Sequence, residues 1–113
     1  MIIKKEQANP EDWGESTILD YPMPNEKIGI SSQEHQGRVP KKGWGINTVC
    51  YEVIYVLGGT AEVYIDDKNY KVKEGDVIIL QPKSKSYLIG NKLRLLTITQ
   101  PNWYKGQYKE VTK

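Results

Sequence analysis

A few polar residues around one strand-like segment carry the chemistry that this chain can perform. Glu52 lies within a run of β-branched and aromatic residues, where burial raises the pKa of a carboxyl group. Such a group can accept a ligand hydroxyl or move a proton as a general acid or base. Cys50 is two residues earlier, so it shares a strand face with Glu52. The structural alternative is that Glu52 hydrogen-bonds to Tyr87, Asn47 or the backbone and only fixes the local geometry.

The chain contains one histidine and one cysteine, which limits both metal binding and nucleophilic catalysis. A single histidine, His35, excludes a multi-histidine metal site, and the polar segment 31–37 around it predicts a strand end or surface loop. Without a nearby histidine to activate it, Cys50 is interpreted as a small packing residue of the pocket wall. We therefore expect no metal, no cofactor and no internal disulfide.

Further candidates lie on either side of the Glu52 segment. Arg38 can clamp a carboxylate or phosphate through two parallel hydrogen bonds, or pair with an acidic residue near the pocket mouth. Trp44 offers an apolar face with a polar edge, which suits stacking on a sugar ring, whereas Trp103 is predicted to pack. The candidate catalytic pair is Glu52 and Tyr87. The candidate ligand-binding residues are Arg38, Trp44, Asn47, Cys50, Glu52 and Tyr87.

Composition places the chain among single globular domains. Its 113 residues and 13.0 kDa fit one hydrophobic core, and 38% hydrophobic with 27% charged residues is ordinary for such a domain. A net charge of +2 with interspersed signs lacks the dense basic face that nucleic-acid binding needs. No apolar run reaches membrane-spanning length, and the first residues lack the apolar region of a secretory signal. We expect a cytoplasmic protein without nucleic-acid or membrane partners.

Strand-length runs separated by turns must position these residues. Turn formers dominate residues 1–45, which predicts two short strands and at most one helical turn, within residues 12–16. From residue 47 onward, β-branched and aromatic runs are broken by glycine, proline or Asp-Asn turns. The absence of crossover helices indicates an all-β antiparallel sandwich or barrel. The predicted strands are 17–19, 27–30, 49–57, 60–65, 70–72, 77–80, 86–89 and 93–99.

The order of glycine and proline motifs on these strands resembles the cupin family. Glu52 stands seven residues before Gly59, as in the second half of the first cupin motif, and the segment 75–82 with Tyr87 resembles the second motif. The resemblance covers residues 27–108 and implies a double-sheet jelly-roll barrel in a single domain of residues 1–113, with residues 1–26 packed on it as strand and loop. It also implies a homodimer formed by the sheets, and the uncharged run 77–80 offers an unprotected edge.

The chain departs from metal-binding cupins at the positions of their histidines. Metal-binding cupins share two histidines shortly before the glutamate and a third histidine in the second motif. In this chain the region before the glutamate reads Trp-Gly-Ile-Asn-Thr at 44–48, and the position of the third histidine falls on Tyr87. Only Glu52 remains, which is a poor match for Zn, Mn or Fe. The chain therefore looks closer to small cupins without the metal histidines.

These features leave three functions open. The first is metal-independent binding of a small polar ligand, a sugar or a small acid, inside the barrel. The second is a metal-independent carbohydrate isomerase, epimerase or lyase in which Glu52 moves a proton with Tyr87 or His35 as its partner. The third is a protein-interaction module whose barrel is filled by its own side chains.

Overall fold

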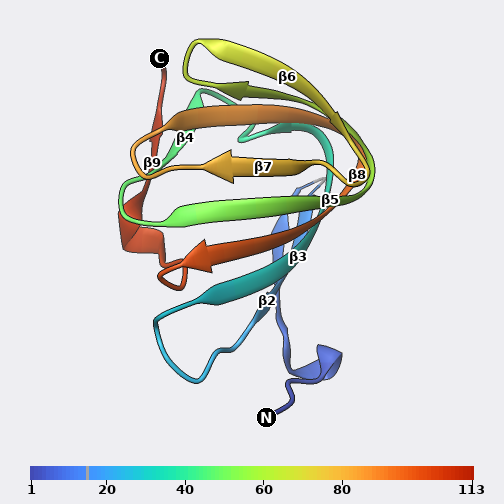
Figure 1. Ribbon diagram of the computed structural model, residues 1–113, viewed down its shortest axis with the longest axis vertical. Helices are drawn as coiled ribbons and strands as arrows, with labels where there is room; N and C mark the ends of the chain where they lie inside the picture. Colours follow the sequence, from blue (N-terminus) through green and yellow to red (C-terminus); the bar gives the residue numbers. More distant parts are fainter. Residues whose placement is uncertain (15) are drawn as a thin grey trace.

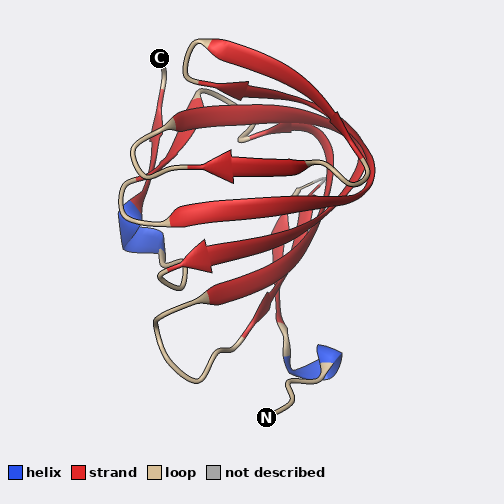
Figure 2. Ribbon diagram, in the orientation of Figure 1, coloured by secondary structure: helices blue, strands red, loops and turns tan. Residues whose placement is uncertain are grey.

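The computed structural model describes residues 1–14 and 16–113, and strands dominate it (Figure 2). Two 3-10 helices, η1 (Lys5–Gln7) and η2 (Lys105–Gln107), are the only helical segments of the described residues. The strands are β1 (Asn9–Trp13), β2 (Ser16–Tyr21), β3 (Gly29–Val39), β4 (Trp44–Asn47), β5 (Tyr51–Ile65), β6 (Lys68–Lys73), β7 (Val77–Leu80), β8 (Lys85–Gln100) and β9 (Tyr108–Val111). Within the part of the chain that is described, no helix is long and apolar enough to cross a membrane.

The strands form one antiparallel sheet that curls around a common interior (Figure 1). The order is β1-β2-β3-β8-β4-β9, and β5 pairs with β6, β7 and β8. The all-β antiparallel jelly-roll fold predicted from the sequence is confirmed. Its two expected sheets are joined, because the long strands β5 and β8 pair with different partners at their two ends.

Both long strands continue through glycines at which the sequence pattern predicts strand ends. Gly58 and Gly59 lie within β5, where the register with β8 shifts on either side of Gly58. Gly59 has φ +76°, and a Cβ at this position would overlap the Lys92 carbonyl. The separation of the predicted strands 86–89 and 93–99 is likewise wrong, because β8 runs through both. Such bulges bend a strand, which lets β5 and β8 wrap around the barrel.

The N-terminal segment differs from its prediction as well. The helical turn expected within 12–16 is wrong, because Asp12 and Trp13 belong to β1 and Ser16 begins β2; Glu15 lies outside the described residues. Pairing of β2 with β3 extends the sheet, and this tertiary pairing overrides the local turn preference. The segment 31–37, expected at a strand end or in a loop, is the middle of β3.

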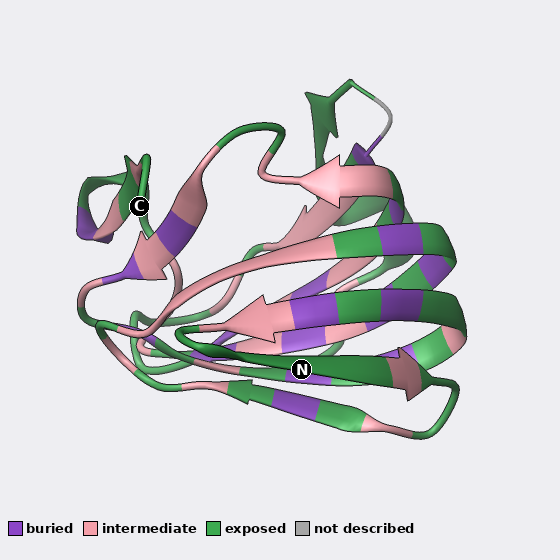
Figure 3. Ribbon diagram, turned by 90° about the horizontal axis from the view of Figure 1, so that it is seen from above, coloured by how far each residue is buried: buried purple, intermediate pink, exposed green. Residues whose placement is uncertain are grey.

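The inner face of the sheet changes from apolar to polar along its strands. Buried and exposed residues alternate along the strands of the barrel (Figure 3). On β8, the buried residues Leu93 and Leu95 are followed on the same face by Thr97 and Thr99. One part of the barrel is therefore filled by a core and the rest has a polar wall. The core consists of Ile54, Val56, Ala61, Val63, Ile78, Leu93 and Leu95.

Candidate functional site

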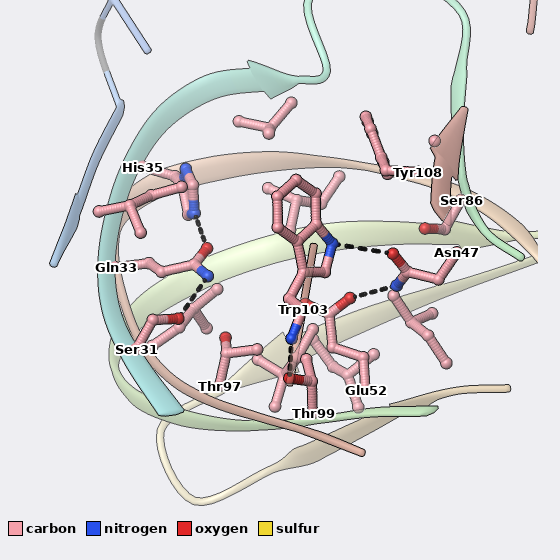
Figure 4. Close-up of a pocket in the computed structure, with 18 of the residues that line it drawn as sticks. Ser31, Gln33, His35, Asn47, Glu52, Ser86, Thr97, Thr99, Trp103 and Tyr108 are labelled. Carbon is pink, nitrogen blue, oxygen red and sulfur yellow. Dashed lines mark hydrogen bonds between the residues drawn. The ribbon is translucent and has the colours of Figure 1, made fainter. Parts of the chain in front are cut away.

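A cavity of about 170 Å³ lies inside the barrel, beside the apolar core. Core residues such as Ile54 and Leu95 form part of its wall, and polar side chains form the rest. Figure 4 shows one polar group on β3 and another around Asn47, with β8 threonines nearby. The polar lining includes Ser31, Gln33, His35, Asn47, Glu52, Ser86, Thr97, Thr99, Trp103 and Tyr108.

Glu52 and Asn47 form the first polar group. The alternation of side chains along β5 places Glu52 on the inner face of the sheet. Asn47 is the last residue of β4 and also lines the cavity. The Asn47 amide donates a 2.7 Å hydrogen bond from Nδ2 to Glu52 Oε1. Burial raises the pKa of Glu52, and this hydrogen bond opposes the rise by stabilising the carboxylate. Glu52 lines the cavity, so its side chain borders the space that a ligand could occupy.

Gln107 fixes the orientation of Asn47. Its side-chain oxygen accepts hydrogen bonds from the backbone N–H groups of Val49 and Cys50, each 3.1 Å long. Its amide nitrogen must then donate, and it does so to Asn47 Oδ1 at 2.8 Å. The Trp103 indole N–H donates to the same oxygen at 3.1 Å. Asn47 therefore has both acceptor positions filled and directs its own N–H group to Glu52.

His35 belongs to the second polar group, on β3. The ring is 4% exposed, and its Nδ1 and Nε2 lie 2.7 Å from Ser16 Oγ and Gln33 Oε1, respectively. Gln33 Nε2 in turn donates to Ser31 Oγ at 3.0 Å. Burial lowers the pKa of His35 to about 4, so the ring is neutral at physiological pH.

The charged groups of the cavity wall are all acidic. Glu11, Asp20 and Glu52 line it, and no Lys or Arg is among the described lining residues. Burial and the nearby Glu11 carboxylate raise the pKa of Asp20. This pattern repels anions and accepts neutral or positively charged ligands.

Among the predicted ligand-binding residues, Asn47, Glu52 and Tyr87 line the cavity, whereas Arg38, Trp44 and Cys50 are not among the lining residues. Tyr87 stacks on Tyr64, its cross-strand partner on β5, with ring centroids 4.4 Å apart. Trp44 contacts the Tyr87 ring edge-on at 4.7 Å. The Arg38 guanidinium lies 3.9 Å from the same ring centroid, and it donates to the carbonyls of Pro40 and Gly43. These contacts hold the Tyr87 ring in place. The ligand-binding roles of Tyr87, Trp44 and Arg38 stay predictions.

Cys50 and His35 also differ from their expected positions. Cys50 is fully buried, but it is not among the cavity-lining residues, and its thiol donates to the Pro101 carbonyl at 3.4 Å. Burial and the nearby Glu52 raise its pKa, which keeps the thiol protonated. His35, expected at the surface, lines the cavity instead.

Sequence reasoning missed several polar residues of the wall. One usable signal was the pattern Leu93-x-Leu95-x-Thr97-x-Thr99, in which two threonines continue the inward face of two leucines. No comparable signal pointed to Gln107, whose partner Asn47 is 60 residues away in the chain.

The donor set of this site does not fit a divalent metal ion. Across residues 1–14 and 16–113, no three His, Cys, Asp or Glu side chains come together as potential ligands. Around Glu52, the neighbouring groups are the amides of Asn47 and Gln107 and the indole of Trp103, which are already hydrogen-bonded to one another.

Comparisons with known proteins identify related sequences and folds. Residues 39–98 match the family model described as "Cupin domain". No curated protein matches the chain.

Several solved structures share the fold at low sequence identity. Pac13, described as a nucleoside dehydratase, is 12% identical, with a TM-score of 0.88 over 99% of this chain and 91% of Pac13. A Streptomyces Pac13 variant with uridine gives the same TM-score and identity over 99% and 90%. Ectoine synthase from P. lautus is 14% identical, with a TM-score of 0.77 over 98% and 90%. A predicted oxalate decarboxylase from Thermotoga maritima is 19% identical, with a TM-score of 0.73 over 89% and 99%.

Proposed function

This chain belongs to the cupin domain family, and on that premise we propose that its barrel binds a small, uncharged polar molecule, namely a sugar or the sugar part of a nucleoside. The proposal rests on the cavity of about 170 Å³ into which Glu52 is turned. Asn47 holds Oε1 of this carboxylate, whereas Oε2 makes no hydrogen bond to another described residue. An engineered cavity of about 150 Å³ takes up benzene, so one sugar-sized ring fits here.

The charge of the cavity favours a sugar over a small acid as the ligand. An anion entering beside Glu11, Asp20 and Glu52 meets carboxylates and no cation from the described wall. A sugar hydroxyl, in contrast, can donate to Glu52 while the apolar residues pack against the ring. Uridine is a suitable neutral probe, because a structural neighbour of the same fold is described with it.

Removal of the Glu52 charge is expected to weaken binding of neutral probes by about 10-fold or more, because hydrogen bonds to a charged group contribute about 1.5–3 kcal/mol. The experiment compares wild type with Glu52→Gln by isothermal titration calorimetry at pH 8, with uridine, uridine 5′-monophosphate, D-glucose and D-glucuronate. Wild type should bind uridine more tightly than uridine 5′-monophosphate, and D-glucose more tightly than D-glucuronate. In Glu52→Gln the difference in affinity within each pair should be smaller.

The matched control is Glu34→Gln on the same barrel, since Glu34 is exposed on β3. This variant should bind the probes as wild type does. Failure of wild type to bind either neutral probe contradicts the proposed function. Unchanged binding by Glu52→Gln assigns Glu52 a structural role instead.

A second candidate function is metal-independent acid–base catalysis on a carbohydrate derivative. The raised pKa of Glu52 favours it, because such a carboxyl exchanges a proton more readily near neutral pH. The partners expected from the sequence give it less support, because the Tyr87 ring stacks on Tyr64 and both His35 nitrogens already have hydrogen-bond partners. Binding is therefore the better-supported function. The open cavity also counts against an interaction module with a filled barrel.

We further propose that the chain forms a homodimer through the outer face of β5 and β7. Outward-facing residues there are large and apolar: Val53 and Tyr55 pair with Ile79 and Val77, and all four are at least 40% exposed. Tyr51 extends the row. An uncharged face can pack against its own copy around a two-fold axis without like-charge repulsion.

The dimer is expected to dissociate when a charge is placed in this row. Wild type should elute in size-exclusion chromatography with light scattering at twice the 13.0 kDa chain mass, and Ile79→Lys at the chain mass. Ile28→Lys changes an exposed isoleucine before β3 and should leave the dimer intact. A monomeric wild type contradicts this assembly.

A further inference from the structure

One hydroxyl in the cavity has no partner within the protein. Thr97 is 3% exposed and lines the cavity, and its Oγ1 is the single buried side-chain oxygen or nitrogen of the described residues without a hydrogen bond. A buried hydroxyl without a partner is destabilising, so such groups require an explanation. Its neighbour Thr99, on the same face of β8, is satisfied by accepting a hydrogen bond from the Trp103 backbone N–H.

Ser31 lies directly across the sheet from Thr97. The two residues are register partners on β3 and β8, both are buried, and both line the cavity. Side chains of such cross-strand partners share a face, with Cβ atoms about 4.5–5.5 Å apart. The two hydroxyls are therefore close enough to contact the same ligand atom.

Hydrogen-bond direction in the β3 group determines what Ser31 offers. Gln33 Oε1 can only accept, so the His35 proton is on Nε2, and the bare Nδ1 accepts from the Ser16 hydroxyl. Gln33 then points its amide nitrogen at Ser31 Oγ. Ser31 accepts that bond, and its own hydroxyl proton remains to be donated. His35 and Gln33 thus position Ser31 as a donor.

We propose that Ser31 and Thr97 form a two-hydroxyl subsite that donates to one acceptor oxygen of the ligand, a carbonyl or ring oxygen. This inference rests on the proposed function and makes it more specific, because the polar groups of the cavity then have opposite roles. Glu52 accepts from a ligand hydroxyl, and the Ser31–Thr97 subsite donates to a ligand oxygen. The ligand class is a neutral molecule that carries both groups, as nucleosides and cyclic sugars do.

The binding experiment uses uridine and D-glucose with wild type, Thr97→Val and Thr97→Ser. Valine has the shape of threonine without the hydroxyl, so Thr97→Val should bind the probes about 5- to 10-fold more weakly. Thr97→Ser keeps the hydroxyl and should bind within about 2-fold of wild type. Thr60→Val makes the same chemical change at an exposed position of β5 and should have no effect on binding.

Thermal unfolding without ligand supplies a second measurement. Because the Thr97 hydroxyl has no protein partner, Thr97→Val should raise Tm by roughly 4 °C. Thr99→Val removes a hydroxyl that is hydrogen-bonded and should lower Tm. A merely structural role of Thr97 would instead make both variants less stable.

The outcomes separate this inference from the proposed function. If wild type binds neither probe, the proposed function fails, and the subsite fails with it. If wild type binds and Thr97→Val binds equally well, only the subsite is wrong. A lower Tm for Thr97→Val also overturns the subsite, because it reveals a partner for the hydroxyl inside the protein.

Discussion

Replacement of Gln107 by leucine is expected to lower the free energy of unfolding by about 3–5 kcal/mol, a large effect for the last residue of the three-residue 3-10 helix η2. The side chain is 1% exposed and accepts hydrogen bonds from two backbone N–H groups while it donates to Asn47. Leucine fills the space but leaves the buried Cys50 N–H and the partly buried Val49 N–H without their acceptor. Chemical denaturation of wild type and Gln107→Leu measures the difference.

The matched control is Gln100→Leu, because Gln100 is exposed at the end of β8. Its effect should stay within about 0.5 kcal/mol, as expected for surface substitutions. Gln107→Glu gives a second comparison: its carboxylate can still accept from the backbone but cannot donate to Asn47 Oδ1. This variant should therefore fall between wild type and Gln107→Leu. Equal stability of Gln107→Leu and wild type would show that the hydrogen bonds of the Gln107 side chain do not stabilise the fold.

The hydrogen bonds of Gln107 affect the candidate site as well as the stability of the fold. Gln107 and Trp103 both donate to Asn47 Oδ1, so the Asn47 amide can only present N–H to Glu52. This arrangement favours the ionised carboxylate at a buried position where desolvation opposes ionisation. Loss of Gln107 should therefore free Asn47 to rotate and weaken the preference for a neutral ligand that donates to Glu52.

Strand alternation correctly predicted the inward-facing residues only in strand segments without a β-bulge. It placed Glu52, Ile54 and Val56 on one face of β5, and these residues do face inward. The run 77–80 was predicted with the bounds that β7 has. Both predictions depend on local residue patterns, which the sequence displays directly.

Tyr87 was assigned to the site by resemblance to the second cupin motif, and strand alternation along β8 could not have tested that assignment. Thr97, Leu95 and Leu93 face inward at odd positions, but the register with β5 shifts between Gly58 and Thr60, opposite residues 94 and 91 of β8. Lys92 adopts a φ of +50° in this stretch. The inward positions are therefore even before the bulge, as for Ser86 and Leu88, and the Tyr87 ring stacks on its cross-strand partner Tyr64. A one-residue change in register moves every side chain to the other face, and nothing in the local sequence specifies it.

His35 escaped prediction for a different reason. Its segment is polar throughout, and polarity ordinarily indicates exposure. Here the polar residues Ser31, Gln33 and His35 face a polar cavity and satisfy one another. The polarity rule fails here because these buried polar side chains are hydrogen-bonded to one another.

Acidification is expected to destabilise the protein by roughly 3 kcal/mol between pH 6.5 and 4 through His35 alone. Burial lowers the pKa of His35 in the folded protein to about 4, against about 6.5 in the unfolded chain. Between these values the unfolded chain binds one proton that the folded protein does not. The contribution is therefore fully present above pH 6.5, declines by about 1.4 kcal/mol per pH unit below it, and levels off near pH 4.

Two carboxyl groups act in the opposite direction, so the measurement must isolate His35. Burial raises the pKa of Glu52 and Asp20, and their protonation favours the folded state as the pH falls. The free energy of unfolding is measured with urea for wild type and His35→Gln at several pH values from 7 to 4. Both proteins contain Glu52 and Asp20, so the difference between the two free energies removes the contributions of these carboxyl groups. The stability advantage of wild type over the variant should shrink by the stated amount on acidification. Parallel curves would show that His35 titrates as it does in the unfolded chain, which contradicts a buried neutral ring that accepts from Ser16 and donates to Gln33.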